Sequence, residues 1–206
     1  MVKTYSGLVH LNGSVLASVD LETTGRRAGY HEIIQIAVVP LNSDLRPAEG
    51  IKPFYTTVRP EHPERQERGA AYVHGININE LILNAPESGK VKDLLVEWFE
   101  RLDLPVGKNL VPLAHNWAFE ASFLTAWLGI EQTGYIFHSH ARDSMLYALS
   151  LNDRAAFKGE KAPFNRVSLG SLCKHFGVPN EAAHDAMNDA LAEAEVYRAI
   201  LHLDLL

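Results

Sequence analysis

Two acidic residues stand at the end of an apolar run near the start of the chain, within residues 15–25 (VLASVDLETTG). Alternate residues of a β-strand point to the same face, so a strand here would hold the carboxylates of Asp20 and Glu22 side by side. Paired carboxylates without thiols or His-x-His neighbours suit a hard divalent cation such as Mg²⁺ or Mn²⁺. An exposed polar strand end is the alternative, because single acidic residues are mostly exposed.

A third acid, Glu120, lies in residues 115–123 (HNWAFEASF), directly after a predicted strand and in the first turns of a predicted helix. At this junction α/β sheets present groups that bind ligands. An acid early in a helix also interacts favourably with the helix dipole. Its position alone therefore leaves both interpretations open.

A histidine and an acid recur near the end of the chain, in residues 184–189 (HDAMND). On a regular helix five residues turn through about 140°, so His184 and Asp189 would not face one site if both were helical. If Asp185 caps the helix, His184 lies in the preceding loop and can fold back over Asp189. That arrangement predicts an imidazole beside a carboxylate. A histidine without a catalytic role is the alternative.

The elements that must position these residues follow from hydrophobic periodicity and turn residues. Strands are predicted at residues 15–22, 32–41, 54–58 and 110–114. Helices are predicted at residues 78–83, 90–102, 116–128, 143–149, 168–176 and 185–203, and loops at 60–69 and 152–166. The three early strands favour an antiparallel meander, and the later alternation of strand and helix implies a parallel strand beside it. Gly25 is expected to supply an unusual backbone conformation at the turn after the first strand.

Composition limits the class of protein. The chain has 206 residues, 47% of them hydrophobic, a single cysteine and a formal net charge of −6. The cysteine count excludes a disulfide framework, and the acidic balance argues against a general nucleic-acid coat without excluding a local basic groove. The first residues lack the pattern of a signal peptide, and no apolar stretch approaches the ~18 residues of a membrane span. We therefore expect a cytoplasmic protein with no membrane partner.

The order and spacing of these motifs resemble the DEDD superfamily of 3′→5′ exonucleases, in its DnaQ-like, histidine (DEDDh) branch. The resemblance covers nearly the whole chain, and its further signatures are His74-Gly-Ile76, His115-Asn116 with Phe119, Arg142-Asp143, Ser168-Leu169 and residues 173–177. It implies an α/β, RNase H-like fold: a central mixed five-stranded sheet with an antiparallel three-strand meander and flanking helices. A single exonuclease domain over residues 1–206 is expected.

The resemblance also implies the activity. The expected reaction is hydrolysis of terminal phosphodiester bonds of single-stranded nucleic acid at its 3′ end, with DNA favoured over RNA, to nucleoside 5′-monophosphates. Two Mg²⁺ or Mn²⁺ ions would be the cofactors, held by Asp20, Glu22, Glu120 and Asp189, with His184 as the general base. The residues expected to contact substrate are Thr23, Thr24, His115, Asn116, Phe119 and Phe123, of which the two phenylalanines could instead be core residues, and His115 and Asn116 could instead cap the helix.

One position departs from the family pattern. The second family motif ordinarily ends in aspartate, and this chain has Glu120, which keeps the charge but reaches one methylene further. Retained activity is our expectation, and a weakened second metal site is the alternative.

Two rival functions follow: a scaffold that binds nucleic acid without turnover, and a proofreading module associated with a polymerase. Cations in residues 152–166, Lys158 and Lys161 among them, are candidates for phosphate contacts, together with Arg26 and Arg27 after the first motif. The apolar residues 203–206 could serve a homodimer contact or pack on the core.

Overall fold

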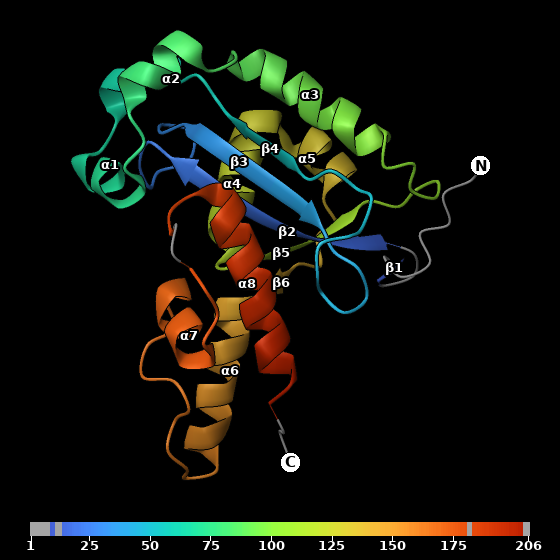
Figure 1. Ribbon diagram of the computed structural model, residues 1–206, viewed down its shortest axis with the longest axis vertical. Helices are drawn as coiled ribbons and strands as arrows, with labels where there is room; N and C mark the ends of the chain where they lie inside the picture. The colour runs from blue at the N-terminus through green and yellow to red at the C-terminus, as the bar shows by residue number, and fades with distance from the viewer. Residues whose placement is uncertain (1–8, 11–13, 181–182, 204–206) are drawn as a thin grey trace.

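A mixed β-sheet forms the centre of the computed structural model, which describes residues 9–10, 14–180 and 183–203 (Figure 1). Its strands run in the order β4-β3-β2-β5-β6, and the short strand β1 also pairs with β2. Strands β2, β3 and β4 pair antiparallel, whereas β5 is parallel to β2 and β6 is parallel to β5. The predicted meander and five-stranded mixed sheet are thus confirmed. The strand bounds are β1 Val9–His10, β2 Ser14–Thr23, β3 Ile33–Pro40, β4 Phe54–Thr57, β5 Leu110–Ala114 and β6 Arg142–Asp143.

Helices cover both faces of the sheet (Figure 1). Helices α3, α4 and α5 pack on one face, α8 packs on the other, and α6 and α7 pack beside α8 in a separate apolar cluster. The helix bounds are η1 Pro63–Arg65, α1 Arg68–His74, α2 Ile78–Asn84, α3 Ser88–Glu100, α4 Trp117–Leu128, α5 Ile130–Ile136, α6 Ser144–Phe157, α7 Leu169–Phe176 and α8 Ala186–Leu201. None of the helices in the described ranges is long and apolar enough to cross a bilayer.

The side chains of strand β2 alternate between these two layers. Val15 and Leu21 belong to the core formed with α3, α4 and α5, whereas Leu16 belongs to the core formed with α8. Because side chains alternate along a strand, the even-numbered positions after Leu16 also face α8. Asp20 and Glu22 occupy two of these positions, so both carboxylates face α8.

Alanines let α8 lie close to the sheet. Ala186, Ala190 and Ala194 are buried among residues of β2, β3 and β5. Small side chains at this interface shorten the distance between helix axis and strand, so polar groups on the same helix face come within reach of β2. The helix that carries Asp189 is thereby held against the strand that carries Asp20.

Several element predictions were wrong. Residues 60–69 are not a continuous loop, because they contain η1 and the start of α1, a helix that buries no residue and so leaves no apolar periodicity. Residues 152–157 are helical rather than irregular, since α6 continues to Phe157. The short elements α5, β1 and β6 were not predicted. Residues 204–206, within the segment considered for a dimer contact, lie outside the described residues.

Gly25 is required for space rather than for an unusual backbone conformation. It is absent from the glycines with positive φ, so the predicted reason was wrong. A Cβ at this position would lie 2.6 Å from Cε1 of His31. The turn after β2 therefore packs directly against the imidazole ring of His31, which leaves no space for a larger side chain at position 25.

Candidate active site

Asp20 and Glu22 lie on one face near the end of β2, as predicted, and that face packs against α8. Asp20 pairs opposite Ala37 of β3, and Glu22 pairs opposite Gln35. Glu22 is buried, with 8% of its surface exposed, and Asp20 is half-buried. The alternative of an open polar strand end is therefore excluded.

The first turn of α8 is tied to the middle of the sheet. Asp185 is its N-cap, as predicted, and its Oδ2 accepts hydrogen bonds from Gln35 Nε2 at 3.1 Å and from the Tyr55 hydroxyl at 2.5 Å. Gln35 Oε1 in turn accepts from the N–H of Ala186 at 2.9 Å. Because Gln35 lies opposite Glu22 in the sheet, this network fixes the start of α8 beside the carboxylates of β2.

His184 precedes the cap and folds back over the helix. Its φ of 69° lies in the left-handed region, which residues other than glycine adopt rarely. Its N–H donates to Asp189 Oδ2 at 3.0 Å, and its Nδ1 lies 3.9 Å from the same oxygen. The predicted imidazole beside a carboxylate is therefore present. Ligand atoms of Glu22, His184 and Asp189 all lie within 4.8 Å of one another.

Glu120 is buried in the first turn of α4, with 4% of its surface exposed. The Asp143 carboxylate anchors this turn, because it accepts hydrogen bonds from the N–H groups of Asn116 at 3.3 Å and Trp117 at 2.8 Å. The charge of Glu120 acts on Asp20 and raises its pKa, after burial and the charge of Glu193. A carboxylate that only interacts with the helix dipole can stay exposed to water. The burial of Glu120 therefore favours the interpretation that it belongs to the acidic cluster.

A fifth acid, Glu193, was not predicted. It lies one turn after Asp189 in α8 and is 0% exposed. Its Oε1 accepts hydrogen bonds from the Ser18 hydroxyl at 2.6 Å and the Val19 N–H at 3.1 Å. Its spacing of four residues from Asp189, which puts both acids on one face of the helix, was the signal available in the sequence.

Burial and mutual repulsion disfavour the ionised form of these acids. Burial raises the pKa of Glu22 to about 8, with further contributions from the charges of Asp189 and Asp185. The pKa of Asp20 is raised well above its usual range by burial and then by the charge of Glu193. Burial likewise raises the pKa values of Glu120, Asp189 and Glu193.

These residues fit divalent cations. Three carboxylate oxygens are buried without a hydrogen-bond partner among the described residues: Glu120 Oε2, Asp189 Oδ1 and Glu193 Oε2. Buried carboxylate oxygens are costly unless a cation or a donor satisfies them. An all-oxygen set of acids, with one imidazole beside it, suits Mg²⁺ or Mn²⁺.

A pocket of about 400 Å³ opens beside Glu22. It is lined by β2 and its turn, by α1 and by the start of α4, with Leu21, Glu22, Thr23, Gly25, Arg26, Glu67, Gly69, Ala70, Val73, His74 and Phe119 as lining residues. Burial and the charge of His184 lower the pKa of His74, whose Nε2 is buried and has no partner in the described part of the chain. The pocket therefore combines apolar walls with polar groups next to the acids.

The predicted substrate residues divide between this pocket and the core. Thr23 and Phe119 line the pocket. Substrate contact is not supported for Thr24, because its side chain is fully buried and its Oγ1 accepts from the N–H of Glu32 at 2.9 Å. Phe123 is a core residue, 2% exposed, so the alternative interpretation was the correct one.

His115 and Asn116 do not line the pocket beside Glu22. His115 Nδ1 shares a hydrogen bond of 2.8 Å with Ser144 Oγ, and burial lowers the pKa of its imidazole. Asn116 occupies the N-cap position of α4 with a φ of 90°, yet its side chain makes no capping hydrogen bond. Both residues help to join α4 to the start of α6, so substrate contact is not supported for either.

The phosphate contacts considered at Lys158 and Lys161 are not supported by their position. Lys158 is the C-cap of α6, and Figure 1 places that end of α6 far from α1 and from the start of α8. Arg26, in contrast, is exposed and lines the pocket beside Glu22. The nearby Arg27 stacks on the Tyr30 ring at 4.0 Å from its centroid.

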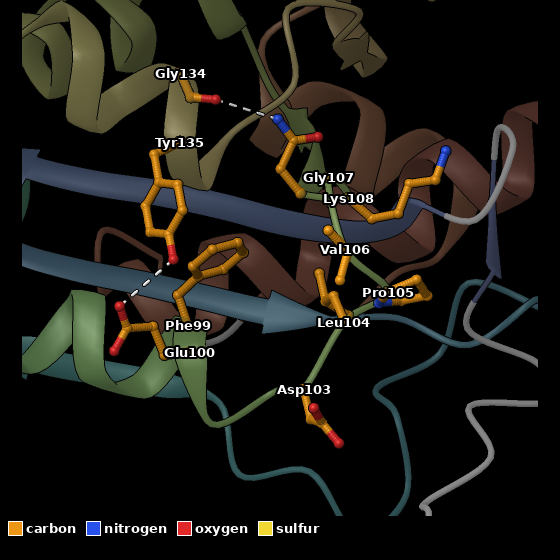
Figure 2. Close-up of a pocket in the computed structure, with 11 residues that line it drawn as sticks. Phe99, Glu100, Asp103, Leu104, Pro105, Val106, Gly107, Lys108, Gly134 and Tyr135 are labelled. Atoms are coloured by element: carbon orange, nitrogen blue, oxygen red, sulfur yellow. Dashed lines mark hydrogen bonds between the residues drawn. The ribbon is translucent and has the colours of Figure 1, made fainter.

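A larger cavity, of about 510 Å³, lies at the opposite end of the sheet (Figure 2). The end of α3, the segment before β5 and part of α5 line it, and the Tyr135 hydroxyl donates to Glu100 Oε1 at 3.4 Å across it. Its lining segment precedes β5, which runs parallel to β2, so the cavity is remote from the carboxyl ends of both strands. None of the clustered acids lines it.

The mixed sheet with helices on both faces is an RNase H-like fold, and the acids gather where the end of β2 meets α4 and α8. Residues 18–197 match the RNase T family model, described as exonuclease. The match spans most of the chain and includes every motif with a clustered acid, and the chain belongs to this exonuclease family. No curated protein matches it.

Solved structures share the fold at low sequence identity. E. coli exonuclease I in complex with a dT13 oligonucleotide is 17% identical, with a TM-score of 0.67, over 92% of this chain and 41% of that one. Exonuclease I from Methylocaldum szegediense is 18% identical, with a TM-score of 0.67, over 92% and 40%. Cell-death related nuclease 4 is 21% identical, with a TM-score of 0.63, over 92% and 64%. The chain thus spans about two fifths of the length of the exonuclease I chains.

Proposed function

We propose that the protein is a metal-dependent 3′→5′ exonuclease that releases nucleoside 5′-monophosphates from single-stranded nucleic acid, with DNA favoured over RNA. The observation that carries the proposal is the convergence of Glu22, His184 and Asp189, whose ligand atoms lie within 4.8 Å of one another at the edge of a pocket. Residues 1–206 are taken as one exonuclease domain. A location in the cytoplasm remains a prediction.

Four acids would hold two Mg²⁺ or Mn²⁺ ions. Asp20 would contribute to both cation sites, since the charges of Glu120, Glu22 and Asp189 all raise its pKa. Glu22 and Asp189 would complete one cation site with Asp20, and Glu120 would complete the other. Bound cations would supply an activated water and offset charge on the phosphate. The zinc-bound complex of E. coli exonuclease I with single-stranded DNA gives this proposal a precedent within the shared fold.

His184 would accept the proton of the attacking water. Its imidazole is half-exposed, and its backbone N–H is bonded to Asp189. The backbone is thereby fixed while the ring faces solvent beside the acids, as a general base requires. Since its Nδ1 is 3.9 Å from Asp189 Oδ2, the ring is not committed to a hydrogen bond with that carboxylate.

The pocket beside Glu22 would receive the terminal nucleotide. Phe119 and Val73 offer apolar surface for a base, and aromatic stacking on unpaired bases tolerates many sequences. Arg26 lies at the same pocket and can face a phosphate. The bound oligonucleotides of E. coli exonuclease I support single-stranded DNA as the substrate class.

Glu120 would keep the second cation site in use. Its carboxylate is buried within the electrostatic reach of Asp20, and its Oε2 has no partner within the described residues. The charge of the longer side chain thus still acts on Asp20 from the anchored start of α4. We propose retained turnover rather than binding alone.

Digestion of end-labelled oligonucleotides tests the proposal. Single-stranded DNA labelled at its 5′ end should shorten stepwise in Mn²⁺ or Mg²⁺, whereas a 3′ label should be released at once as a mononucleotide. EDTA and the Asp20→Ala variant should each abolish the reaction. Matched RNA and duplex DNA should be cleaved more slowly. Tight binding of the oligonucleotide without release of nucleotides would instead establish the binding-module alternative.

A further inference from the structure

Glu193 is the most deeply buried acid of the cluster and has no role in the mechanism above. It is 0% exposed, lies one turn after Asp189, and follows Ala190 and Ala192, which are also buried. An acidic side chain at such a position requires a compensating group, because burial strongly disfavours its charged form.

One oxygen of Glu193 is held rigidly. Its Oε1 accepts from the Ser18 hydroxyl at 2.6 Å and from the Val19 N–H at 3.1 Å. Both donors lie on β2 immediately before Asp20. The carboxylate is therefore oriented by the same strand that presents the proposed metal ligands.

The other oxygen is only loosely held. Glu193 Oε2 is buried and has no hydrogen-bond partner of regular geometry in the described part of the chain, although the backbone N–H of His115 also donates toward this carboxylate. Glu120 Oε2 is in the same condition. One buried glutamate oxygen on α8 and one on α4 are thus without a regular hydrogen bond among the described residues.

The neighbours of Glu193 carry negative charge. Its Oε1 lies 3.1 Å from the backbone nitrogen of Val19, the residue before Asp20, and Asp189 lies one turn before it on α8. None of the ion pairs found among the described residues joins Asp20, Glu120 or Glu193 to a lysine or an arginine. A bound cation would supply the positive charge that these carboxylates lack when they are ionised.

We propose that Glu193 is a fifth carboxylate of the cation site, and that its Oε2 binds the divalent cation on the side of Asp20 and Glu120. The inference rests on the proposed function and deepens it. A hard cation such as Mn²⁺ or Mg²⁺ is the ligand that an oxygen set of this kind selects. The cation site that includes Glu120 would then have two glutamates. Glu120 is the residue at which this chain departs from the family pattern.

The test is Mn²⁺ binding to the full chain, measured by titration calorimetry and by the electron paramagnetic resonance signal of free Mn²⁺. In Glu193→Gln, the amide oxygen can still accept from Ser18 and Val19, so the variant removes the charge while keeping the shape and the anchoring hydrogen bonds. One of two Mn²⁺ ions should bind at least tenfold more weakly. The matched control is Glu195→Gln on the same helix, whose carboxylate pairs with Arg198 at 2.9 Å, and its Mn²⁺ affinities should equal those of the wild type.

A second variant keeps the proposal testable if Glu193→Gln does not fold. Ser18→Ala removes the hydroxyl that orients Oε1, and it should weaken the same Mn²⁺ ion several-fold in a folded protein. Wild-type Mn²⁺ affinities in Glu193→Gln, or in Ser18→Ala where Glu193→Gln does not fold, would overturn the fifth ligand. If the wild type then still degraded single-stranded DNA, the proposed function would stand without it. Absence of Mn²⁺ binding and of nuclease activity in the wild type would overturn both.

Discussion

Gln35 and Asp185, 150 residues apart in the sequence, are joined by a hydrogen bond of 3.1 Å from Gln35 Nε2 to Asp185 Oδ2. Through its Oε1, Gln35 also accepts from the N–H of Ala186 at 2.9 Å. One buried amide on β3 thus holds both the cap and the first residue of α8. Because His184 and Asp189 flank this point, the amide sets where they lie relative to Glu22.

Gln35→Ala should therefore reduce both stability and activity. Losing these partners leaves buried polar groups unsatisfied, and we expect a loss of about 1–3 kcal/mol in the free energy of unfolding. Displacement of His184 and Asp189 should lower kcat about tenfold at saturating Mn²⁺. Chemical denaturation and the rate on single-stranded DNA measure the two effects. Gln132→Ala, on the remote helix α5, is the control and should change stability by no more than about 0.5 kcal/mol.

The contrast between Asp20 and Glu193 shows how much of the site could be predicted from sequence. Asp20, Glu22, His184 and Asp189 stand in short motifs whose local geometry, a strand period and a helix cap, already brings pairs of side chains together. The spacing of Glu193 from Asp189 indicates only a shared helix face, and the packing of α8 against Ser18 is what reveals that Glu193 is buried. The link from Gln35 and Tyr55 to Asp185 likewise depends on strand register, which no local pattern encodes. Helix α1 buries no residue, so hydrophobic periodicity could not mark it.

His184→Ala should separate proton transfer from cation binding. Without a general base, kcat should fall about 10²-fold to 10⁴-fold, while Mn²⁺ affinity stays within about threefold of wild type if the acids alone hold the cations. Single-turnover rates and Mn²⁺ titration measure the two quantities. A large loss of Mn²⁺ affinity would show that the imidazole is a ligand, which its proximity to Glu22 and Asp189 permits.

The metal-free protein should lose stability as pH rises. The pKa of Glu22 is raised from 4.5 to about 8, so the folded state retains a proton that the unfolded state releases. Its stabilising contribution is complete below about pH 4.5 and is lost as pH approaches 8, a change on the order of 4 kcal/mol. Thermal unfolding in EDTA from pH 5 to pH 8 should show a falling Tm, and Mn²⁺ should raise Tm more at pH 8. A flatter profile is expected for Glu22→Gln, and an unchanged slope would contradict the assignment.

Gly25→Ala should destabilise the turn beside the pocket. The added methyl group would lie 2.6 Å from the His31 ring. That ring cannot move freely, since its Nδ1 accepts from the N–H of Arg27 at 3.0 Å and its Nε2 lies 3.5 Å from a Glu67 carboxylate oxygen. Such overpacking typically costs about 1–3 kcal/mol. Gly89→Ala is the control, because nothing lies within 4 Å of its Cβ and it is in helix α3, where alanine should stabilise by about 0.5–1 kcal/mol.

Glu120 decides whether the departure from the family pattern is tolerated. Glu120→Gln keeps the length and removes the charge, so the cation beside Asp20 should bind more weakly and kcat should fall at least about 100-fold. Glu120→Asp keeps the charge, but its side chain is shorter by one methylene. The helix cannot easily shift to compensate, because Asp143 holds the start of α4 in place. We expect about a tenfold loss of kcat for the aspartate variant, with Mn²⁺ affinity between those of the wild type and Glu120→Gln. A wild-type rate in Glu120→Gln would remove this residue from the site and leave the cations to the acids of β2 and α8.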